Sequence, residues 1–146
     1  MKLISITANL HSFKGELNWT DPTRVRLVFS DGKSLRVRVA SDGESVILDD
    51  LPLDEPFDMG EYGRVEVHDF HNGVDPLLLS SEIATLNAIL DGDGRMIGLA
   101  VQRIEGIAFC LWNYGDELHY GEFGALLAYD WEPQAKPMIG PPIMLE

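Results

Sequence analysis

Two Ser-Asp-Gly triplets, at residues 30–32 and 41–43, each close a run of alternating apolar and polar residues. The triplets lie eleven residues apart, a spacing typical of short strands joined by tight turns. The sequence therefore predicts an antiparallel three-strand meander over residues 24–48. The eleven-residue recurrence of the triplet reflects the period of this meander and not that of a solenoid repeat.

The turn at Ser30, Asp31 and Gly32 fixes the expected register of the meander. A two-residue turn would pair charged with apolar side chains on both faces, whereas a three-residue turn with a left-handed Gly32 pairs like with like. The pairs then expected are Leu27 with Leu35, Val25 with Val37, Arg26 with Arg36 and Arg24 with Arg38. One face should hold Val25, Leu27, Phe29, Leu35, Val37, Val39 and Ile47, and the other Arg24, Arg26, Arg36 and Arg38.

A helix is predicted over residues 76–91. Its apolar positions are Leu79, Ile83, Leu86 and Leu90, preceded by Asp75 and Pro76 as cap and first turn and followed by Gly92. Strands are expected at the N-terminus, over 64–70, in a hairpin of 96–104 and 107–114, and over 117–120 and 125–129. In the hairpin a turn at Glu105-Gly106 would pair Leu99 with Trp112 and Val101 with Cys110. Both faces of the hairpin are apolar, so it should lie at the centre of a covered sheet.

These patterns predict an α+β fold, with a mainly antiparallel β-sheet formed by the meander 24–48 and the hairpins 96–120. The helix at about 76–91 should pack on it, in a sandwich-like arrangement or a partly open barrel. We expect a single domain over residues 1–146, with an acidic loop at 49–63 and a Pro-rich C-terminal arm at 131–146.

The cysteine and apolar-run patterns point to the cytoplasm. Cys110 is the one cysteine, which excludes an intramolecular disulfide and favours a reducing compartment. Its large apolar neighbours argue for a buried structural thiol. No apolar run approaches the roughly 18 residues of a membrane span, and the apolar start is too short for a secretory signal. We expect a cytoplasmic protein of bacterial type.

Charge is distributed unevenly along the chain. The 146 residues include 24 acids and 11 lysines or arginines, for a net charge of −13. Between residues 42 and 75 there are eleven acids and one base. This acidic run could be a solvated loop, or it could neutralise the arginine face of the meander. Its negative charge is larger than the four arginines of that face can neutralise. The surplus opposes nucleic acid and anionic membranes and favours a basic protein partner.

The loop at 49–63 combines six acids with apolar residues, as interface cores with polar rims do. We expect a non-catalytic acidic binding module, most concretely an immunity-type inhibitor that neutralises a basic, nuclease-like toxin. The residues predicted to bind the partner are Asp49, Asp50, Leu53, Asp54, Glu55, Phe57, Asp58, Glu61 and Tyr62.

The alternative is a small hydrolase or lyase that uses His68, Asp69 and His71. No serine elbow, phosphate loop or zinc-protease motif accompanies these residues. A metal site is not expected, because His68 and His71 would point to opposite faces of a strand. No cofactor is expected either, because the sequence contains no cofactor motif. Residues 91–94 resemble a calcium loop only briefly and should form a tight turn.

The C-terminal arm holds four prolines among five large apolar residues. Proline excludes a regular helix or a central strand there. The arm should therefore pack on its own domain, or it could join a twin subunit as a homodimer through residues 137–146.

Overall fold

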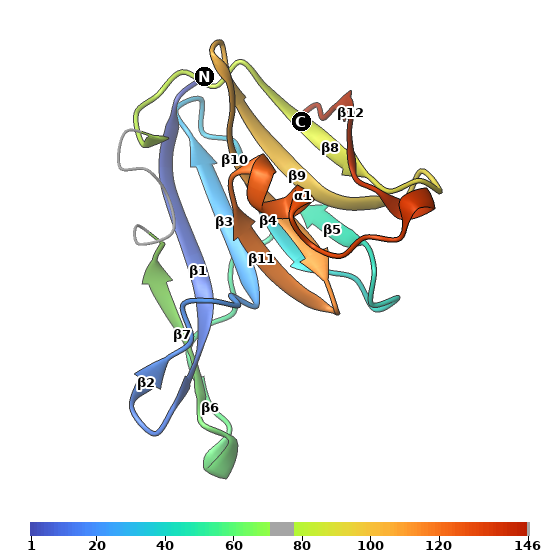
Figure 1. Ribbon diagram of the computed structural model, residues 1–146. Coiled ribbons are helices and arrows are strands. Elements are labelled where there is room, and N and C mark those ends of the chain that lie inside the picture. Colours follow the sequence, from blue (N-terminus) through green and yellow to red (C-terminus); the bar gives the residue numbers. More distant parts are fainter. Residues whose placement is uncertain (71–77, 146) are drawn as a thin grey trace.

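Two antiparallel sheets make up the computed structural model, which describes residues 1–70 and 78–145 (Figure 1). The first sheet contains β1 (Leu3–Phe13), β2 (Glu16–Leu17), β3 (Arg24–Phe29), β4 (Ser34–Val39), β5 (Val46–Asp49), β6 (Phe57–Asp58) and β7 (Arg64–Asp69). The second contains β8 (Thr85–Leu90), β9 (Met96–Arg103), β10 (Gly106–Tyr114), β11 (Glu117–Gly121) and β12 (Met138–Pro142). The short helical segments are η1 (Gly60–Tyr62), α1 (Phe123–Leu127) and η3 (Pro133–Ala135).

The larger sheet has the order β5-β4-β3-β1-β7-β6, with β2 paired to the end of β1. The first two strands of its meander have the predicted register, because Leu27 lies opposite Leu35 and Arg26 opposite Arg36. Gly32 has a φ of 88°, the left-handed conformation that the bulged turn requires. The separation into an apolar and an arginine face is thus confirmed for β3 and β4.

The smaller sheet has the order β11-β10-β9-β8-β12, which places the predicted hairpin at its centre. One face of β9 and β10 enters the core between the sheets through Leu99 and Leu111. The other face carries Cys110 and Trp112 into a second apolar cluster with Leu126 of α1. The hairpin is therefore covered on both sides, as its doubly apolar sequence predicts.

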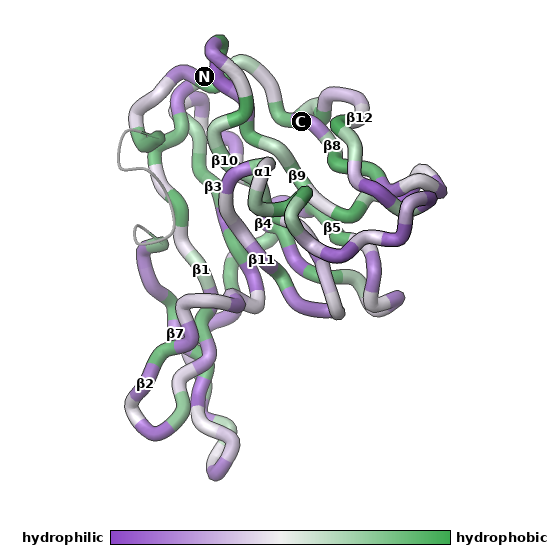
Figure 2. The backbone as a smooth tube through the Cα atoms, in the orientation of Figure 1, coloured by the Kyte–Doolittle hydropathy of each residue, from purple (hydrophilic) through white to green (hydrophobic). Residues whose placement is uncertain are grey.

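The core lies between the two sheets, where apolar strand segments face one another while the turns remain polar (Figure 2). The larger sheet contributes buried side chains such as Ile6, Leu10 and Phe29, and the smaller sheet contributes Leu86 and Phe109. The structure thus confirms the predicted fold class, a mainly antiparallel β-sheet fold in a partly open sandwich. Within the described ranges no helix is long and apolar enough to cross a membrane.

The helix predicted over 76–91 is wrong where the structure describes that stretch. Residues 85–90 form β8, paired with β9 and β12, and residues 71–77, with Asp75 and Pro76, lie outside the described residues. Leu86 and Leu90 are four apart, a spacing that puts them on one side of a helix but also on one face of a strand. Leu86 enters the core between the sheets, and Ile89 enters the second cluster. The strand conformation is stabilised by pairing with β9 on one edge and β12 on the other.

The helix occurs instead at α1, where a strand over 125–129 was expected. This short helix buries Leu126 in the second cluster, packs Phe123 against it, and leaves Ala125 and Leu127 exposed.

Two register predictions also need correction. The turn between β9 and β10 is at Ile104 and Glu105, and a bulge near Ala108 pairs Leu99 with Leu111 rather than with Trp112. In β5, Ile47 lies opposite Arg38, so it belongs to the arginine face rather than to the apolar face. A register shift of one residue in either strand exchanges its two faces, and the expected turn length alone could not determine the register.

The C-terminal arm packs on the same chain. Met138 and Ile139 of β12 lie opposite Leu90 and Ile89 of β8, and the backbone N–H of Ile143 donates to the carbonyl of Leu86 at 2.6 Å. Strand β12 is at the sheet edge, the position that tolerates its prolines.

Candidate functional site

The acidic loop begins by crossing the arginine face of the larger sheet. Its residues 50–56, here called the strap, connect β5 at one edge of this sheet with β6 at the other (Figure 1). Five strand spacings separate these edges, about 24 Å. The eight steps from Asp49 to Phe57 reach at most about 26–29 Å. The strap must therefore run nearly extended, which leaves no slack for a helix.

Asp49 anchors the start of the strap through Arg36. The Arg36 Nε donates to Asp49 Oδ1 at 2.8 Å, and a second guanidinium nitrogen donates to Oδ2 at 2.7 Å. These hydrogen bonds are the main cause that lowers the pKa of Asp49 and raises that of Arg36. Arg36 also donates to the carbonyl of Pro52 at 3.1 Å. Arg36, a residue that is only 7% exposed, thus has partners on both the neighbouring strand β5 and the strap.

Asn9 and Arg24 hold the middle of the strap. The buried Asn9 amide donates to the carbonyl of Asp54 at 2.9 Å and accepts from the Asp54 N–H at 2.9 Å. It thereby pairs with the strap as a neighbouring strand would. The Asp54 carboxylate lies 2.9 Å from a guanidinium nitrogen of Arg24. The expected neutralisation of the arginine face by the acidic run is therefore visible in these contacts.

The structure divides the nine residues predicted to bind a partner into three sets. Asp49 and Asp54 face arginines of their own chain, and Leu53 is half-buried. Asp50 is exposed at the β5 end of the strap. The other five are exposed at the opposite end and are here called the tip surface: Glu55, Phe57, Asp58, Glu61 and Tyr62.

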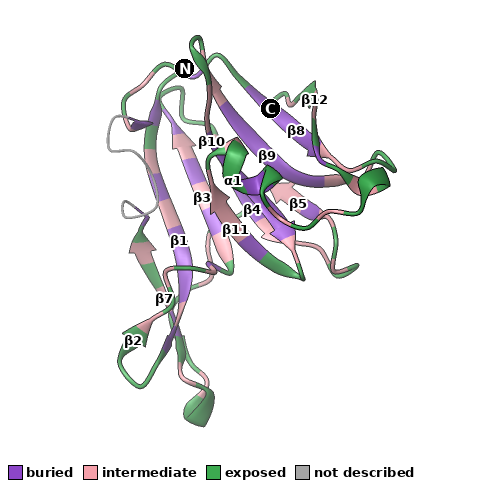
Figure 3. Cartoon of the chain, in the orientation of Figure 1, coloured by how far each residue is buried: buried purple, intermediate pink, exposed green. Residues whose placement is uncertain are grey.

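The tip surface lies on a projection formed by the end of β1 with β2, β6 and β7, which extends beyond the smaller sheet (Figures 1 and 3). Phe57 lies opposite Val65, which lies opposite His11, so these three residues share one face. The His11 ring contacts the carbonyl of Tyr62 and stacks at 6.5 Å on Phe13. Phe13 is an exposed aromatic residue that the sequence pattern did not mark as a binding residue.

Large apolar side chains are unusually exposed on this projection. Tyr62 is 69% exposed, and Phe13 and Phe57 are each 45% exposed. The backbone beneath them is fixed by β-pairing, and by Asp58, whose carboxylate accepts from the Gly60 N–H at 2.7 Å. Gly63 is required there, because a Cβ would collide with the carbonyl of Ser12. The aromatic residues are thus presented on an ordered framework.

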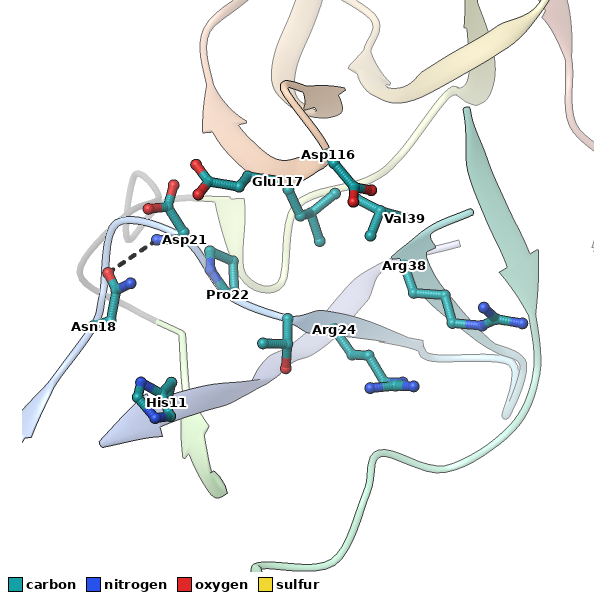
Figure 4. A pocket seen from close by; sticks show the side chains of 11 residues that line it. His11, Asn18, Asp21, Pro22, Arg24, Arg38, Val39, Asp116 and Glu117 are labelled. Atoms are coloured by element: carbon teal, nitrogen blue, oxygen red, sulfur yellow. Dashed lines mark hydrogen bonds between the residues drawn. The ribbon is translucent and has the colours of Figure 1, made fainter. Parts of the chain in front are cut away.

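A hollow of about 350 Å³ lies where the 18–23 segment meets the start of β11 (Figure 4). Figure 4 shows the carboxylates of Asp21 and Glu117 on one side of it and Arg24 and Arg38 on the other. The two arginines already have carboxylate neighbours, at 2.9 Å for Arg24 and Asp54 and 3.8 Å for Arg38 and Asp49.

Asp21 and Glu117 belong to a cluster with His119 that the sequence analysis did not find. One ligand atom from each residue lies within 4.8 Å of the others. Glu117 and His119 are two apart in β11 and so share a face, which is a signal present in the sequence. Asp21 is almost a hundred residues distant, and only the folded chain shows that it joins them.

Comparison of the chain with protein-family models, with curated proteins and with solved structures finds no match. Function must therefore be inferred from the geometry of these surfaces.

Of the three residues expected to serve a hydrolase or lyase, the two that the structure describes, His68 and Asp69, do not lie together in one site. His68 and Asp69 are consecutive in β7 and point to opposite faces of the sheet. The His68 ring lies 3.4 Å from Glu66 and contacts Trp19. His71 lies outside the described residues.

Cys110 is buried, as expected, and burial raises the pKa of its thiol to about 12. Such a thiol carries almost no thiolate at neutral pH and is a poor nucleophile. Asp91 caps its own turn by accepting from the N–H groups of Asp93 and Arg95, so residues 91–94 form the predicted tight turn.

Proposed function

We propose that the protein is a non-catalytic binding module that recognises a basic protein through the tip surface. The observation that carries this proposal is the presence of two exposed aromatic residues, Phe57 on the paired strand β6 and Tyr62 in η1, in the same segment as three carboxylates with no arginine contact among the described ion pairs.

The apolar part of the surface supplies a reason to bind. Burying an aromatic side chain in an interface is favourable by on the order of 1.5–3 kcal/mol. Phe13, Phe57 and Tyr62 retain much of their surface for such burial. A rigid framework lowers the entropic cost of forming the interface.

The charged part supplies a preference for the partner. Glu55, Asp58 and Glu61 are exposed in the same short segment as Phe57 and Tyr62, and the whole chain carries a charge of −13. A field of this sign accelerates the approach of a basic protein and slows that of a polyanion. In its most concrete form, the proposal is an immunity-type inhibitor that covers the basic nucleic-acid groove of a nuclease-like toxin in a bacterial cytoplasm.

The test uses capture from an extract of the native host on three immobilised proteins. These are the wild type, a tip variant (Glu55→Lys with Glu61→Lys) and a matched control (Glu105→Lys with Glu132→Lys). The control changes the net charge equally but alters exposed residues outside the tip surface. We expect the wild type and the control to retain a basic protein that the tip variant loses.

Two results would contradict the proposal. One is an acidic protein as the specifically retained partner, and the other is equal retention by the tip variant. The immunity-type form is tested separately, by adding the wild-type chain to the captured protein and measuring hydrolysis of RNA and DNA. Unchanged hydrolysis would reject the inhibitor form alone.

A further inference from the structure

The cluster of Asp21, Glu117 and His119 lies apart from the tip surface, between the 18–23 segment and β11. The His119 ring is enclosed by aromatic residues and is stacked at 6.1 Å on Trp112. Its side chain is 15% exposed, whereas that of Asp21 is 27% exposed. Glu117 is exposed at the edge of the hollow.

The backbone determines which nitrogen of His119 carries a proton. Its Nε2 lies 2.9 Å from the carbonyl oxygen of Tyr114. A carbonyl only accepts, so Nε2 must be the protonated nitrogen. In the neutral ring the lone pair is then on Nδ1. Metal-ligating histidines are oriented in this way, with the other ring N–H donated to a carbonyl or carboxylate.

The Nδ1 lone pair faces an oxygen that lacks a donor. Asp21 Oδ1 is buried and accepts no hydrogen bond from the described part of the chain, and it lies 3.5 Å from His119 Nδ1. Two lone pairs at this separation repel one another unless a positive group lies between them. The Tyr129 hydroxyl reaches Nδ1 at 3.3 Å, a long hydrogen bond that does not serve Asp21.

The spacing of these atoms suits a divalent transition metal. Zn²⁺ binds nitrogen and carboxylate oxygen at about 2.0–2.2 Å, so neighbouring ligand atoms of a tetrahedral site are about 3.3–3.6 Å apart. The separation of Asp21 Oδ1 and His119 Nδ1 is 3.5 Å. Glu117, within 4.8 Å of both, is exposed and can close the remaining distance by changing rotamer.

We propose that Asp21, Glu117 and His119 form a binding site for one divalent transition-metal ion of the Zn²⁺ class. Two carboxylates and one imidazole supply three ligands and leave a fourth position for water. That mixed donor set favours Zn²⁺, Mn²⁺ or Fe²⁺ over Ca²⁺, which prefers oxygen donors alone. The ion ties the 18–23 segment to β11, two parts of the chain that lie in different sheets or their connections.

The test is a titration of ¹⁵N-labelled wild-type protein with Zn²⁺ after treatment with a chelator, followed by NMR of the imidazole nitrogens. We expect saturation at one ion per chain and a shift of His119 Nδ1, with its Nε2 still protonated. His68, which does not line the hollow, serves as an internal reference. A Zn²⁺-independent His119 spectrum would overturn the proposal and would indicate that a proton on Nδ1 satisfies Asp21.

Variants then distinguish coordination from general attraction by negative charge. Asp21→Asn and His119→Gln should each weaken Zn²⁺ binding in calorimetry by more than about 100-fold, the upper end of what loss of an outer contact typically costs. Asp116→Asn removes a neighbouring charge of the same hollow and should leave the affinity within about two-fold. Equal weakening by all three variants would contradict the site. If a ligand variant does not fold, the wild-type titration alone decides.

Discussion

Arg36 and Asp49 lie directly opposite one another in the β4–β5 pair and are joined by two hydrogen bonds, of 2.8 and 2.7 Å. One contact therefore does two things. It satisfies a buried arginine in the sheet, and it fixes the point from which the strap crosses that sheet. The acidic loop is in this way divided into a structural part, near the arginines, and an exposed part at the tip.

Replacing Asp49 by Ala should destabilise the protein by about 2–4 kcal/mol, because it leaves a buried guanidinium without its charged partner. The measurement is urea unfolding. Asp50→Ala, which alters the exposed neighbour, is the matched control and should change stability by no more than about 0.5 kcal/mol. Similar effects of the two substitutions would contradict a structural role for the ion pair.

The same pair predicts a dependence of stability on pH. Hydrogen bonding to Arg36 lowers the pKa of Asp49 in the folded protein below its unfolded value. Its contribution is therefore fully present above the unfolded pKa of about 3.9 and is lost as the pH falls through the folded pKa. The difference in unfolding free energy between wild type and Asp49→Asn should shrink from pH 6 to acid pH. A difference that stays constant over this range would show that ionisation of Asp49 does not matter.

The β3–β4 pair could be predicted to the level of register because its signals are local. Turn length, Gly32 and like-with-like pairing all refer to residues within a few positions. Strand β8 could not be predicted in this way, because Leu86 and Leu90 fit either period. Its strand conformation follows from pairing with β9 and with β12, which is about fifty residues farther along the chain.

Deleting residues 137–146 should lower the melting temperature by at least about 5 °C, because β12 and the partly buried Ile139, Ile143 and Leu145 leave the domain. Pro141 and Pro142 lack N–H groups, so β12 is poorly suited to pairing with a twin subunit. Sedimentation should show a monomer with and without the arm. A full-length dimer that becomes a monomer on truncation would instead support the homodimer.

Gly92 allows the C-terminal segment to pack against the 91–94 turn. A Cβ at this position would overlap the carbonyl group of Gln134. Gly92→Ala should therefore destabilise the protein by about 1–3 kcal/mol in urea unfolding. Gly124→Ala in α1, where a Cβ meets open space, is the control and should be neutral or slightly stabilising. No loss of stability in Gly92→Ala would mean that this contact is not maintained in solution.

Sequence reasoning identified the acidic loop but not which of its acids are available. Asp54 and Glu55 are adjacent and chemically alike, yet one faces Arg24 and the other is exposed. Only the path of the strap separates them. The cluster around His119 was missed for a related reason, since Asp21 approaches β11 from a distant part of the chain.

The proposed function is tested most directly by the association rate of the chain with the basic protein that it captures, measured by stopped flow at low and high salt. Exposed charges act mainly on the rate of encounter, so the Glu55→Lys/Glu61→Lys variant should associate at least about ten-fold more slowly than wild type at low salt. Its rate should also depend less on salt, while the Glu105→Lys/Glu132→Lys control stays closer to wild type. Equal rates for the tip variant and the control would contradict recognition through the tip surface.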